Sequence, residues 1–353
     1  MEATPEEIHQ TIDHLFRRQA GKVVAALTRQ FGSDHLDLAE DIIHDILLKA
    51  LDQWPRNGIP PEPGRWMLAA ARNLAVDHLR RKSFMLQHES EITAHFEGVL
   101  QNEAFIPILD SEIADDMLRM IFTCCHPILT RESQIALTLR TLSNFTIEDI
   151  ARALSVEESA AAKRIVRAKA KLREVLIPFE VPIGNELEPR VNGVLNVLYL
   201  IFSLGYQSQN NDRELRREIC EDAIRWSELL SASPAGGLPK IDALIAFMYF
   251  QFARFDAQYR PDGEMLTISV QDRTLWNWQM IGEGFLRLER SARGELISEY
   301  HLEAAILACH CSAESFEETD WKEIVNLYDV LVTLNPAPGV AKGREFALKM
   351  ASS

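Results

Sequence analysis

The sequence predicts an all-α protein, and three observations support this. Apolar residues recur at helical spacing along nearly the whole chain, whereas strand-like alternation is scarce. No Asn-Gly or Asp-Gly pair joins two β-rich runs, so the commonest hairpin signal is missing. Apolar residues make up 47 % and charged residues 25 % of the chain, which is typical of a folded globular protein. The length of 353 residues favours two or three domains.

The first predicted domain covers residues 1–95. Isoleucine and leucine follow helical spacing within 37–52. The segment 54–64 holds four prolines and two glycines, so we expect a loop there. A second helix is predicted over 65–82, where apolar residues share one face and the last three residues are basic. The polar and acidic residues 96–113 are then predicted to form a linker.

The second predicted domain, residues 114–183, carries a helix-turn-helix pattern. Thr146 and Asp149 have the spacing of a capping box at the start of a short helix. A longer helix follows over 157–175, and two short helices with a tight turn are typical of this motif. The residues predicted to face inward are Ala161, Ile165, Ala168 and Leu172. The basic residues predicted on the outer side are Lys163, Arg164, Arg167, Lys169, Lys171 and Arg173.

The remaining residues, 184–353, are predicted to form a third helical domain. Helical segments alternate with short loops rich in proline and glycine, which indicates stacked helical hairpins of a solenoid-like or tetratricopeptide-like kind. No clean fixed-period repeat is present. Aromatic residues of this part, among them Trp276 and Trp278, are expected in its core.

The charge of the chain is uneven. The formal net charge of −15 argues against a protein that coats DNA without specificity, because phosphate binding requires a positive surface. Basic residues nevertheless gather at 65–82 and at 159–173. The local field decides whether a surface can meet phosphate, so these two clusters are candidate DNA contacts.

Several classes of protein are not supported by the sequence. Five cysteines do not make a disulfide scaffold, and we find neither a signal peptide nor a membrane span, so we expect a cytoplasmic protein. The Cys124-Cys125-His126 and Cys309-His310-Cys311 runs lack the Cys-x2-Cys spacing of a zinc site, which favours buried thiols. No phosphate-binding loop or catalytic motif is present. We therefore predict no enzyme activity, no metal and no cofactor.

Three segments resemble bacterial sigma factors of the sigma-70 family, extracytoplasmic-function type. Residues 39–51 are similar to the polymerase-binding helix of region 2, residues 66–82 to its promoter-melting helix, and residues 144–173 to the helix-turn-helix of region 4. Shorter stretches are similar to a subgroup with a long fused helical C-terminal domain: 117–127, 177–182, 197–206 and 320–329. In that subgroup the extension is thought to act as the regulator in place of a separate anti-sigma factor.

The resemblance implies a polymerase contact on the first of these helices. In sigma factors this helix docks on a basic coiled coil of the polymerase clamp. Asp41 and Asp45 are four residues apart and so share a helix face, and Leu48 follows them one turn later. We expect these three residues to bind core RNA polymerase.

The resemblance also implies a contact with the −10 promoter element. The segment 54–64 corresponds to the part that captures a flipped base, and such contacts use aromatic pockets and cations. Asparagine and arginine can read base edges, whereas the last three basic residues hold phosphates of the upstream duplex. The expected −10 contacts are Trp54, Arg56, Asn57, Arg72, Asn73, Arg80, Arg81 and Lys82.

For the −35 element, the resemblance implies that the second helix of the helix-turn-helix enters the major groove. The expected contacts are Glu158, Ser159, Ala160, Lys163, Arg164 and Arg167. The run of alanines at 160–162 offers methyl groups that can meet thymine but cannot form bidentate hydrogen bonds. Glu157 falls at the cap position and is a poor N-cap, although Ser155 with Glu158 offers an earlier capping box.

The resemblance therefore implies an alternative sigma factor that binds core RNA polymerase at its clamp and flap regions, recognises −10 and −35 elements and helps to melt the promoter. The fused C-terminal domain would tune this activity, and an intramolecular contact between it and the sigma domains is a further expectation. The alternative is a stand-alone helix-turn-helix regulator with a C-terminal domain that senses a ligand. Such a regulator would bind duplex DNA without polymerase.

Overall fold

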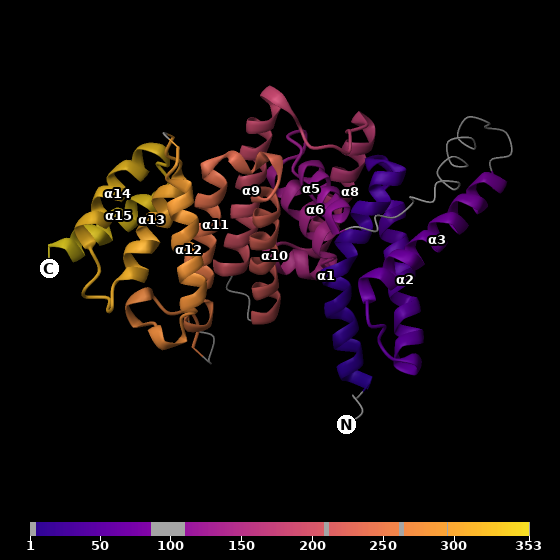
Figure 1. Cartoon of the computed structure of the whole chain (residues 1–353), viewed down its shortest axis with the longest axis horizontal. Helices are drawn as coiled ribbons and strands as arrows, with labels where there is room; N and C mark the ends of the chain where they lie inside the picture. Colours follow the sequence, from indigo (N-terminus) through magenta and orange to yellow (C-terminus); the bar gives the residue numbers. More distant parts are fainter. Residues whose placement is uncertain (1–4, 86–109, 208–211, 261–264, 295, 353) are drawn as a thin grey trace. The chain divides into compact units, whose positions relative to one another are not determined.

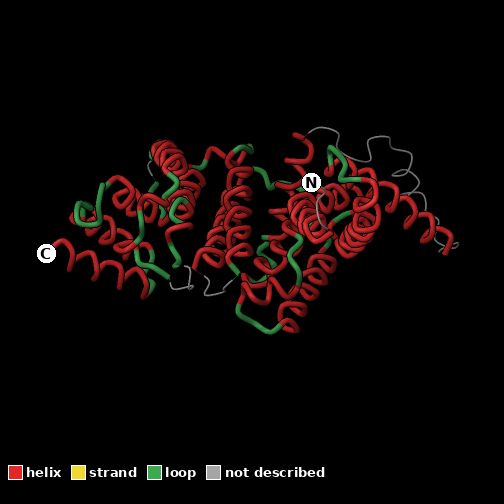
Figure 2. The backbone as a smooth tube through the Cα atoms, turned by 90° about the horizontal axis from the view of Figure 1, so that it is seen from below, coloured by secondary structure: helices red, strands yellow, loops and turns green. Residues whose placement is uncertain are grey.

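The computed structural model describes residues 5–85, 110–207, 212–260, 265–294 and 296–352. In these ranges the chain is helical and contains no β-strand, apart from one isolated antiparallel bridge between Tyr259 and Met265. The backbone drawn in Figure 2 consists of helices and connecting loops in the parts described. The predicted all-α class is therefore confirmed. None of the described helices is both long enough and apolar enough to span a membrane.

The chain divides into two compact units, residues 1–197 and residues 198–353. The division falls inside α9, which spans Leu187–Gln207, so the first turns of this helix belong to the N-terminal unit. The predicted third domain starts earlier, at residue 184. Each unit is described by itself below.

The N-terminal unit contains two groups of helices (Figure 1). The first group is α1 (Pro5–Phe31), α2 (Leu36–Asn57) and α3 (Pro63–Met85). The second is α5 (Asp110–Cys124), α6 (Arg131–Ser143), α7 (Ile147–Leu154) and α8 (Glu158–Val175). Helix α5 begins within the stretch predicted to be a linker, and the remaining predicted linker residues, 96–109, lie outside the described residues.

Helix α1 joins the two groups because it packs against α2 and α3 of the first and against α5 and α6 of the second. Residues 20–28 of α1 are buried on every side except at Lys22, and a helix that is apolar all round belongs in a protein interior. At Gly21 the backbones of α1 and α6 approach closely, since a Cβ there would lie 2.1 Å from the carbonyl oxygen of Leu142. Glycine is needed at this crossing because no side chain fits.

The loop expected at 54–64 is shorter than predicted. Helix α2 continues to Asn57 and carries Pro55 near its end, and the loop is limited to residues 58–62. Trp54 is only 2 % exposed, and its ring centroid lies 5.9 Å from that of Phe16 and 5.1 Å from that of Trp66. The burial of this large ring between α1 and α3 holds the end of α2 in place, so Trp54 is a core residue and its predicted contact with DNA is wrong.

The C-terminal unit contains the second half of α9 and six further helices among its described residues: α10 (Arg213–Ser231), α11 (Pro239–Phe252), α12 (Trp278–Ser291), α13 (Glu299–Ser312), α14 (Trp321–Leu334) and α15 (Pro338–Ala351). Each helix from α10 onward packs against the next one along the chain, and α11 also packs against α13. This pattern agrees with the predicted stacked hairpins. Trp276 is buried as expected, but Trp278 is 51 % exposed and does not belong to the core.

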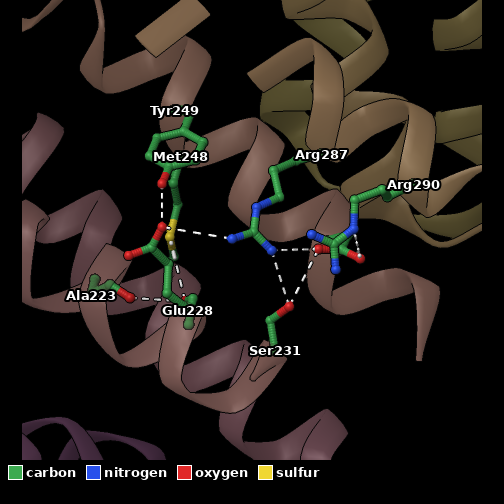
Figure 3. Close-up of polar contacts among 9 residues, drawn as sticks. Ala223, Glu228, Ser231, Met248, Tyr249, Arg287 and Arg290 are labelled. Carbon is green, nitrogen blue, oxygen red and sulfur yellow. Dashed lines mark hydrogen bonds and ion pairs between the residues drawn. The ribbon is translucent and has the colours of Figure 1, made fainter. Parts of the chain in front are cut away.

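A polar network ties α10, α11 and α12 together (Figure 3). Arg287 lies 2.8 Å from a carboxylate oxygen of Asp242 and donates a 3.1 Å hydrogen bond to Ser231. Arg290 approaches the other carboxylate oxygen of Asp242 at 3.5 Å. Tyr249 donates a hydrogen bond to Glu228, which Arg287 also approaches. One buried carboxylate is thus shared by two arginines of the next helix, which fixes the packing of these three helices.

We expect the substitution Trp54→Ala to lower the free energy of unfolding by about 3–5 kcal/mol, because it leaves a cavity among α1, α2 and α3. Urea denaturation followed by circular dichroism measures this change. The exposed Arg56→Ala is the matched control, since its surface ion pair with Asp52 is worth less than about 1 kcal/mol. A Trp54→Ala variant as stable as this control would contradict the assignment of Trp54 to the core.

Candidate nucleic-acid interface

The helix-turn-helix forms at the predicted place. The Thr146 side chain accepts a 3.0 Å hydrogen bond from the backbone N–H of Asp149, and the Asp149 carboxylate accepts one of 3.1 Å from the backbone of Thr146. The predicted capping box at the start of α7 is therefore confirmed. Helix α7 ends at Leu154, and its C-cap residue Ser155 has a left-handed φ of 52°. Ser155 closes α7 and does not cap α8, so the alternative capping box with Glu158 is wrong.

Helix α8 presents two different sides. Ala161, Ile165, Ala168 and Leu172 are at most 5 % exposed, which confirms the predicted inward stripe. Glu157 occupies the N-cap and its side chain makes no capping hydrogen bond, as predicted. The apolar stripe fixes which way α8 faces, because a rotation about its axis would expose these four side chains.

The basic side of α8 divides into two halves. In the first part, residues 158–167, which is called the first half below, Lys163 and Arg167 are exposed and Arg164 is half-buried. None of these three cations forms an ion pair with another described residue. Glu158 and Ser159 are also exposed, and Ala160 is half-buried. All six residues predicted to meet the −35 element therefore share the accessible first half of the helix.

The second half of α8 is occupied by contacts with α2 and the short segment before it. The Lys169 side chain is only 9 % exposed, and its Nζ lies 3.0 Å from Asp37 and 2.8 Å from Glu40. Arg173 pairs with Asp37 and donates a 3.2 Å hydrogen bond to the carbonyl oxygen of Asp34. The prediction that Lys169 lies on the outer face is wrong, because these carboxylates draw it into the protein.

The pKa values of two carboxylates, Asp37 and Asp116, are shifted by their burial and by the cations beside them. Partial burial acts to raise the pKa of Asp37, but the hydrogen bonds and charges of Lys169 and Arg173 outweigh it and hold the pKa below its usual value. Asp116 on α5 pairs with Arg119 at 2.7 Å and with Arg29 of α1 at 3.4 Å. Burial raises the pKa of Asp116 in spite of these two cations. The two helix groups are thus joined by charged contacts as well as by the apolar surface of α1.

The residues predicted to bind polymerase lie farther along α2. Asp41 is exposed, Leu48 is 53 % exposed, and the Asp45 side chain is 45 % exposed with His78 of α3 at 3.9 Å. Glu40 forms an ion pair with Lys169 of α8, and the next residue, Asp41, is the first of the exposed residues predicted to bind polymerase. The structure keeps all three predicted residues accessible.

The residues predicted to meet the −10 element have different surroundings. Arg56 is 74 % exposed and pairs with Asp52 at 2.6 Å, and Asn57 is exposed at the end of α2. Arg72 and Asn73 of α3 are exposed and make no hydrogen bond or ion pair with another described residue. The side chains of Arg80, Arg81 and Lys82 lie outside the described residues.

Both cysteine runs contain thiols held in the interior. Cys124 and Cys125 are fully buried at the end of α5, and burial raises the pKa of the Cys125 thiol to about 12. Cys311 is buried at the end of α13, and Cys309 is half-buried. This agrees with the interpretation of these runs as buried thiols, which are poor metal ligands while protonated.

Comparisons with known proteins identify the parts of the chain. A model of sigma-70 region 2 matches residues 15–84, and a model of sigma-70 region 4 matches residues 119–172. A family of unknown function, DUF6596, matches residues 190–292. An uncharacterized protein of Rhizobium meliloti (strain 1021) is 36 % identical over 340 residues, which cover 93 % of this chain and 77 % of that protein. No solved structure matches this chain.

The class that these regions define is the bacterial transcription initiation factor. The chain belongs to the sigma-70 family of sigma factors, and its role lies in promoter recognition and transcription initiation. Region 2 corresponds to α1, α2 and α3, and region 4 to the helices from α5 to α8. The ion pairs of Lys169 and Arg173 therefore join region 4 to region 2.

The sequence did not single out the residues that make this connection. Asp37 precedes the segment similar to the polymerase-binding helix and Glu40 lies at its start, but neither was a predicted contact. Lys169 and Arg140 look like ordinary surface cations. Arg140 approaches Glu40 at 3.3 Å, so this carboxylate serves two cations of region 4. Residues 34–41 are acidic and residues 169–173 are basic, which is compatible with a contact between the two segments. Nothing in the sequence indicates that these two segments are the ones that meet.

We expect the substitution Gly21→Ala to disturb the contact between regions 2 and 4, because the new methyl group would lie 2.1 Å from a backbone oxygen of α6. Such overpacking costs about 1–3 kcal/mol, so the N-terminal unit should unfold at a lower urea concentration. Small-angle scattering should also show a larger radius of gyration.

The matched control for this experiment is Gly193→Ala, since no atom lies within 4 Å of a Cβ built at Gly193. Both variants add one methyl group to a helix. If the Gly21→Ala and Gly193→Ala proteins have the same stability and the same scattering profile, the close approach of α1 and α6 is not required for the contact.

Proposed function

We propose that this chain is an alternative sigma factor of the extracytoplasmic-function type, which binds core RNA polymerase and directs it to promoters with −10 and −35 elements. The observation that carries this proposal is the presence of two basic clusters, on α3 and on the first half of α8, in a chain with a net charge of −15; of their cations Arg72, Lys163 and Arg167 are exposed. Such a chain should bind free DNA poorly and act when polymerase holds it against the promoter.

Region 4 is proposed to read the −35 element with the first half of α8. Glu158, Ser159 and Ala160 would meet base edges in the major groove, and Lys163, Arg164 and Arg167 would contact phosphates. Among the described residues none of these three cations forms an ion pair, although Arg164 interacts electrostatically with Glu132. This supports the assignment, because the same helix neutralises its later cations with carboxylates. A methyl group at Ala160 favours contact with thymine.

Region 2 is proposed to hold the −10 element through α3 and the end of α2. Arg72 and Asn73 are exposed on α3, so an amide and a guanidinium group are available for bases and phosphates. Arg56 and Asn57 lie at the helix end beside the loop 58–62 and complete the proposed surface. Trp54 has no part in it. Arg80, Arg81 and Lys82 remain proposed contacts to upstream phosphates.

The polymerase contact is proposed to lie on α2. Asp41 and Asp45 supply negative charge, and Leu48 supplies an exposed apolar side chain beside it. This combination suits the basic coiled coil of the polymerase clamp, because charge guides the encounter and apolar burial strengthens the complex. Region 4 is proposed to contact the flap. Since polymerase and promoter lie in the cytoplasm, we place this protein there as well.

The docked arrangement of regions 2 and 4 is proposed to be the polymerase-free state. Elements centred at −10 and −35 are roughly 25 base pairs apart, which corresponds to about 85 Å along B-DNA. A compact unit of some 200 residues is only about 40 Å across. Lys169 and Arg173 must therefore leave Asp37 and Asp34 before both regions can reach their elements on straight DNA.

The extension is proposed to begin near residue 184 and to tune sigma activity as a helical, tetratricopeptide-like domain. Its first turns are joined to region 4 inside the N-terminal unit. Arg190 donates a 2.8 Å hydrogen bond to the carbonyl oxygen of Phe122, and Arg131 donates one of 3.0 Å to that of Gly193. These bonds support a mechanical continuity between region 4 and α9.

A binding experiment with core polymerase tests the polymerase contact. We expect Asp41→Lys to weaken binding to core RNA polymerase about tenfold, because it places a cation against a basic partner. The control is Asp77→Lys, which makes the same charge change on exposed α3. If the wild-type chain fails to bind core polymerase and binds duplex DNA tightly by itself, it is a stand-alone helix-turn-helix regulator instead.

Transcription from a −35-dependent promoter tests the role of α8. The double variant Arg164→Ala/Arg167→Ala should lose about tenfold in transcription and reduce the salt dependence of promoter binding by about two ions. Lys171→Ala removes a cation of the same helix that already pairs with Glu174 at 2.9 Å, and it should leave both quantities unchanged. Equal losses in the two proteins would contradict the assignment.

A further inference from the structure

The C-terminal unit contains a cavity of about 780 Å³ that the sigma function does not use. Among the described residues, it is lined by the end of α9, the end of α11 and residues from 258–259 and 265–271. Its size falls within the range of small-molecule sites, about 300–1,000 Å³. The residues that shape it are two tyrosines, four glutamines, one arginine, one threonine and three apolar residues, and none of the described lining residues is acidic.

Among the described residues that line the cavity, the one cation is Arg254. It is only 5 % exposed and lies over the Trp276 ring, 5.8 Å from its centroid. Nε donates a 3.2 Å hydrogen bond to the carbonyl oxygen of Phe250, and Nη2 donates to the Gln251 side chain. Among the described residues Arg254 has no carboxylate partner, and its Nη1 has no hydrogen bond. A buried guanidinium without a counter-charge is costly, so an anion at this position would stabilise it.

Two further arginines near the cavity also lack carboxylate partners among the described residues. Arg216 is 3 % exposed, bonds to the carbonyl oxygens of Gly205 and Tyr206 at 3.0 and 3.1 Å, and lies 4.0 Å from the centroid of the Tyr259 ring. Arg273 stacks at 4.5 Å over Trp276 and bonds to backbone carbonyl groups. Three guanidinium groups without a carboxylate in an ion pair thus lie in or near this cavity among the described residues.

The glutamines of the cavity are oriented as acceptors. The Gln258 amide nitrogen donates a 3.1 Å hydrogen bond to the carbonyl oxygen of Tyr206, and that of Gln271 donates one of 3.1 Å to Leu266. These bonds fix both amides and leave their Oε1 atoms buried without a partner. Gln258 is 2 % exposed. A buried acceptor without a donor is costly, so a ligand that brings N–H groups would be favoured.

We propose that this cavity binds a small organic anion with the chemistry of a nucleotide: an acidic group, an aromatic ring and an exocyclic amine. The acidic group would pair with Arg254, the amine would donate to Oε1 of Gln258, and the ring would lie against Tyr206 and Tyr259. Arg216 and Arg273 add to the attraction without touching the ligand. This site lies within the C-terminal unit and is independent of the sigma function.

Calorimetric titration of the full chain with adenosine monophosphate as the probe tests this proposal. We expect binding of the probe to be about tenfold tighter than binding of adenosine or of inorganic phosphate, because a charge-assisted hydrogen bond and the ring contact act together. Inosine monophosphate, in which an oxo group replaces the exocyclic amine, should also bind more weakly. Equal affinity for adenosine monophosphate and either adenosine or phosphate would overturn the proposed class of ligand.

Two variants test the residues. Arg254→Gln should weaken binding of adenosine monophosphate about tenfold, whereas Arg293→Gln, which removes an exposed arginine of the same unit, should not change it. If Arg254→Gln lowers the melting temperature, a loss of binding could reflect a loss of folding. The variant Gln258→Met then tests the site, since it removes the unpaired oxygen with little change in volume, and it should also weaken binding of adenosine monophosphate. No binding of the probe by the wild-type chain, or unchanged binding by Arg254→Gln or Gln258→Met, would overturn the proposal.

Discussion

The structure of the sigma domains depends on one buried ammonium group. Lys169 lies between Asp37 and Glu40, and removal of either carboxylate would leave a charge in the interior without its full complement. Arg140 approaches the same Glu40, so the position of α8 on α2 is linked to that of α6. This one arrangement docks region 4 on region 2 and decides which half of the recognition helix stays accessible.

The same contact explains how an acidic chain can present basic surfaces. The carboxylates at the start of α2 neutralise the second half of α8, where Lys169 and Arg173 are held. The cations of the first half have no such partners among the described residues. The net charge of −15 therefore measures neither the sign nor the size of the field near the start of α8. The basic face of α8 thus depends on which of its cations form ion pairs with carboxylates as much as on the number of basic residues in the chain.

Local patterns were predictable from the sequence, and contacts between distant segments were not. The capping box at Thr146 and the apolar stripe of α8 depend on residues within one or two turns, so spacing alone reveals them. The burial of Trp54 depends on Phe16 and Trp66, and that of Lys169 on α2. A tryptophan beside a proline and a lysine in a basic run look like surface residues until their partners are known, which is why both were misplaced.

Helix α1 sets the cost of separating regions 2 and 4. Residues 20–28 are buried almost completely, and they pack against helices of both regions. Separation in water would expose apolar surface, which costs about 25 cal/mol of free energy for each Å². The loss of the ion pairs would be partly offset by hydration of the separated charges. The apolar part of the contact therefore opposes opening in addition to the ion pairs of Lys169 and Arg173. The proposed open state therefore needs a partner that covers the surface of α1 exposed by separation. In that proposal, polymerase both holds the DNA-binding helices and covers this surface.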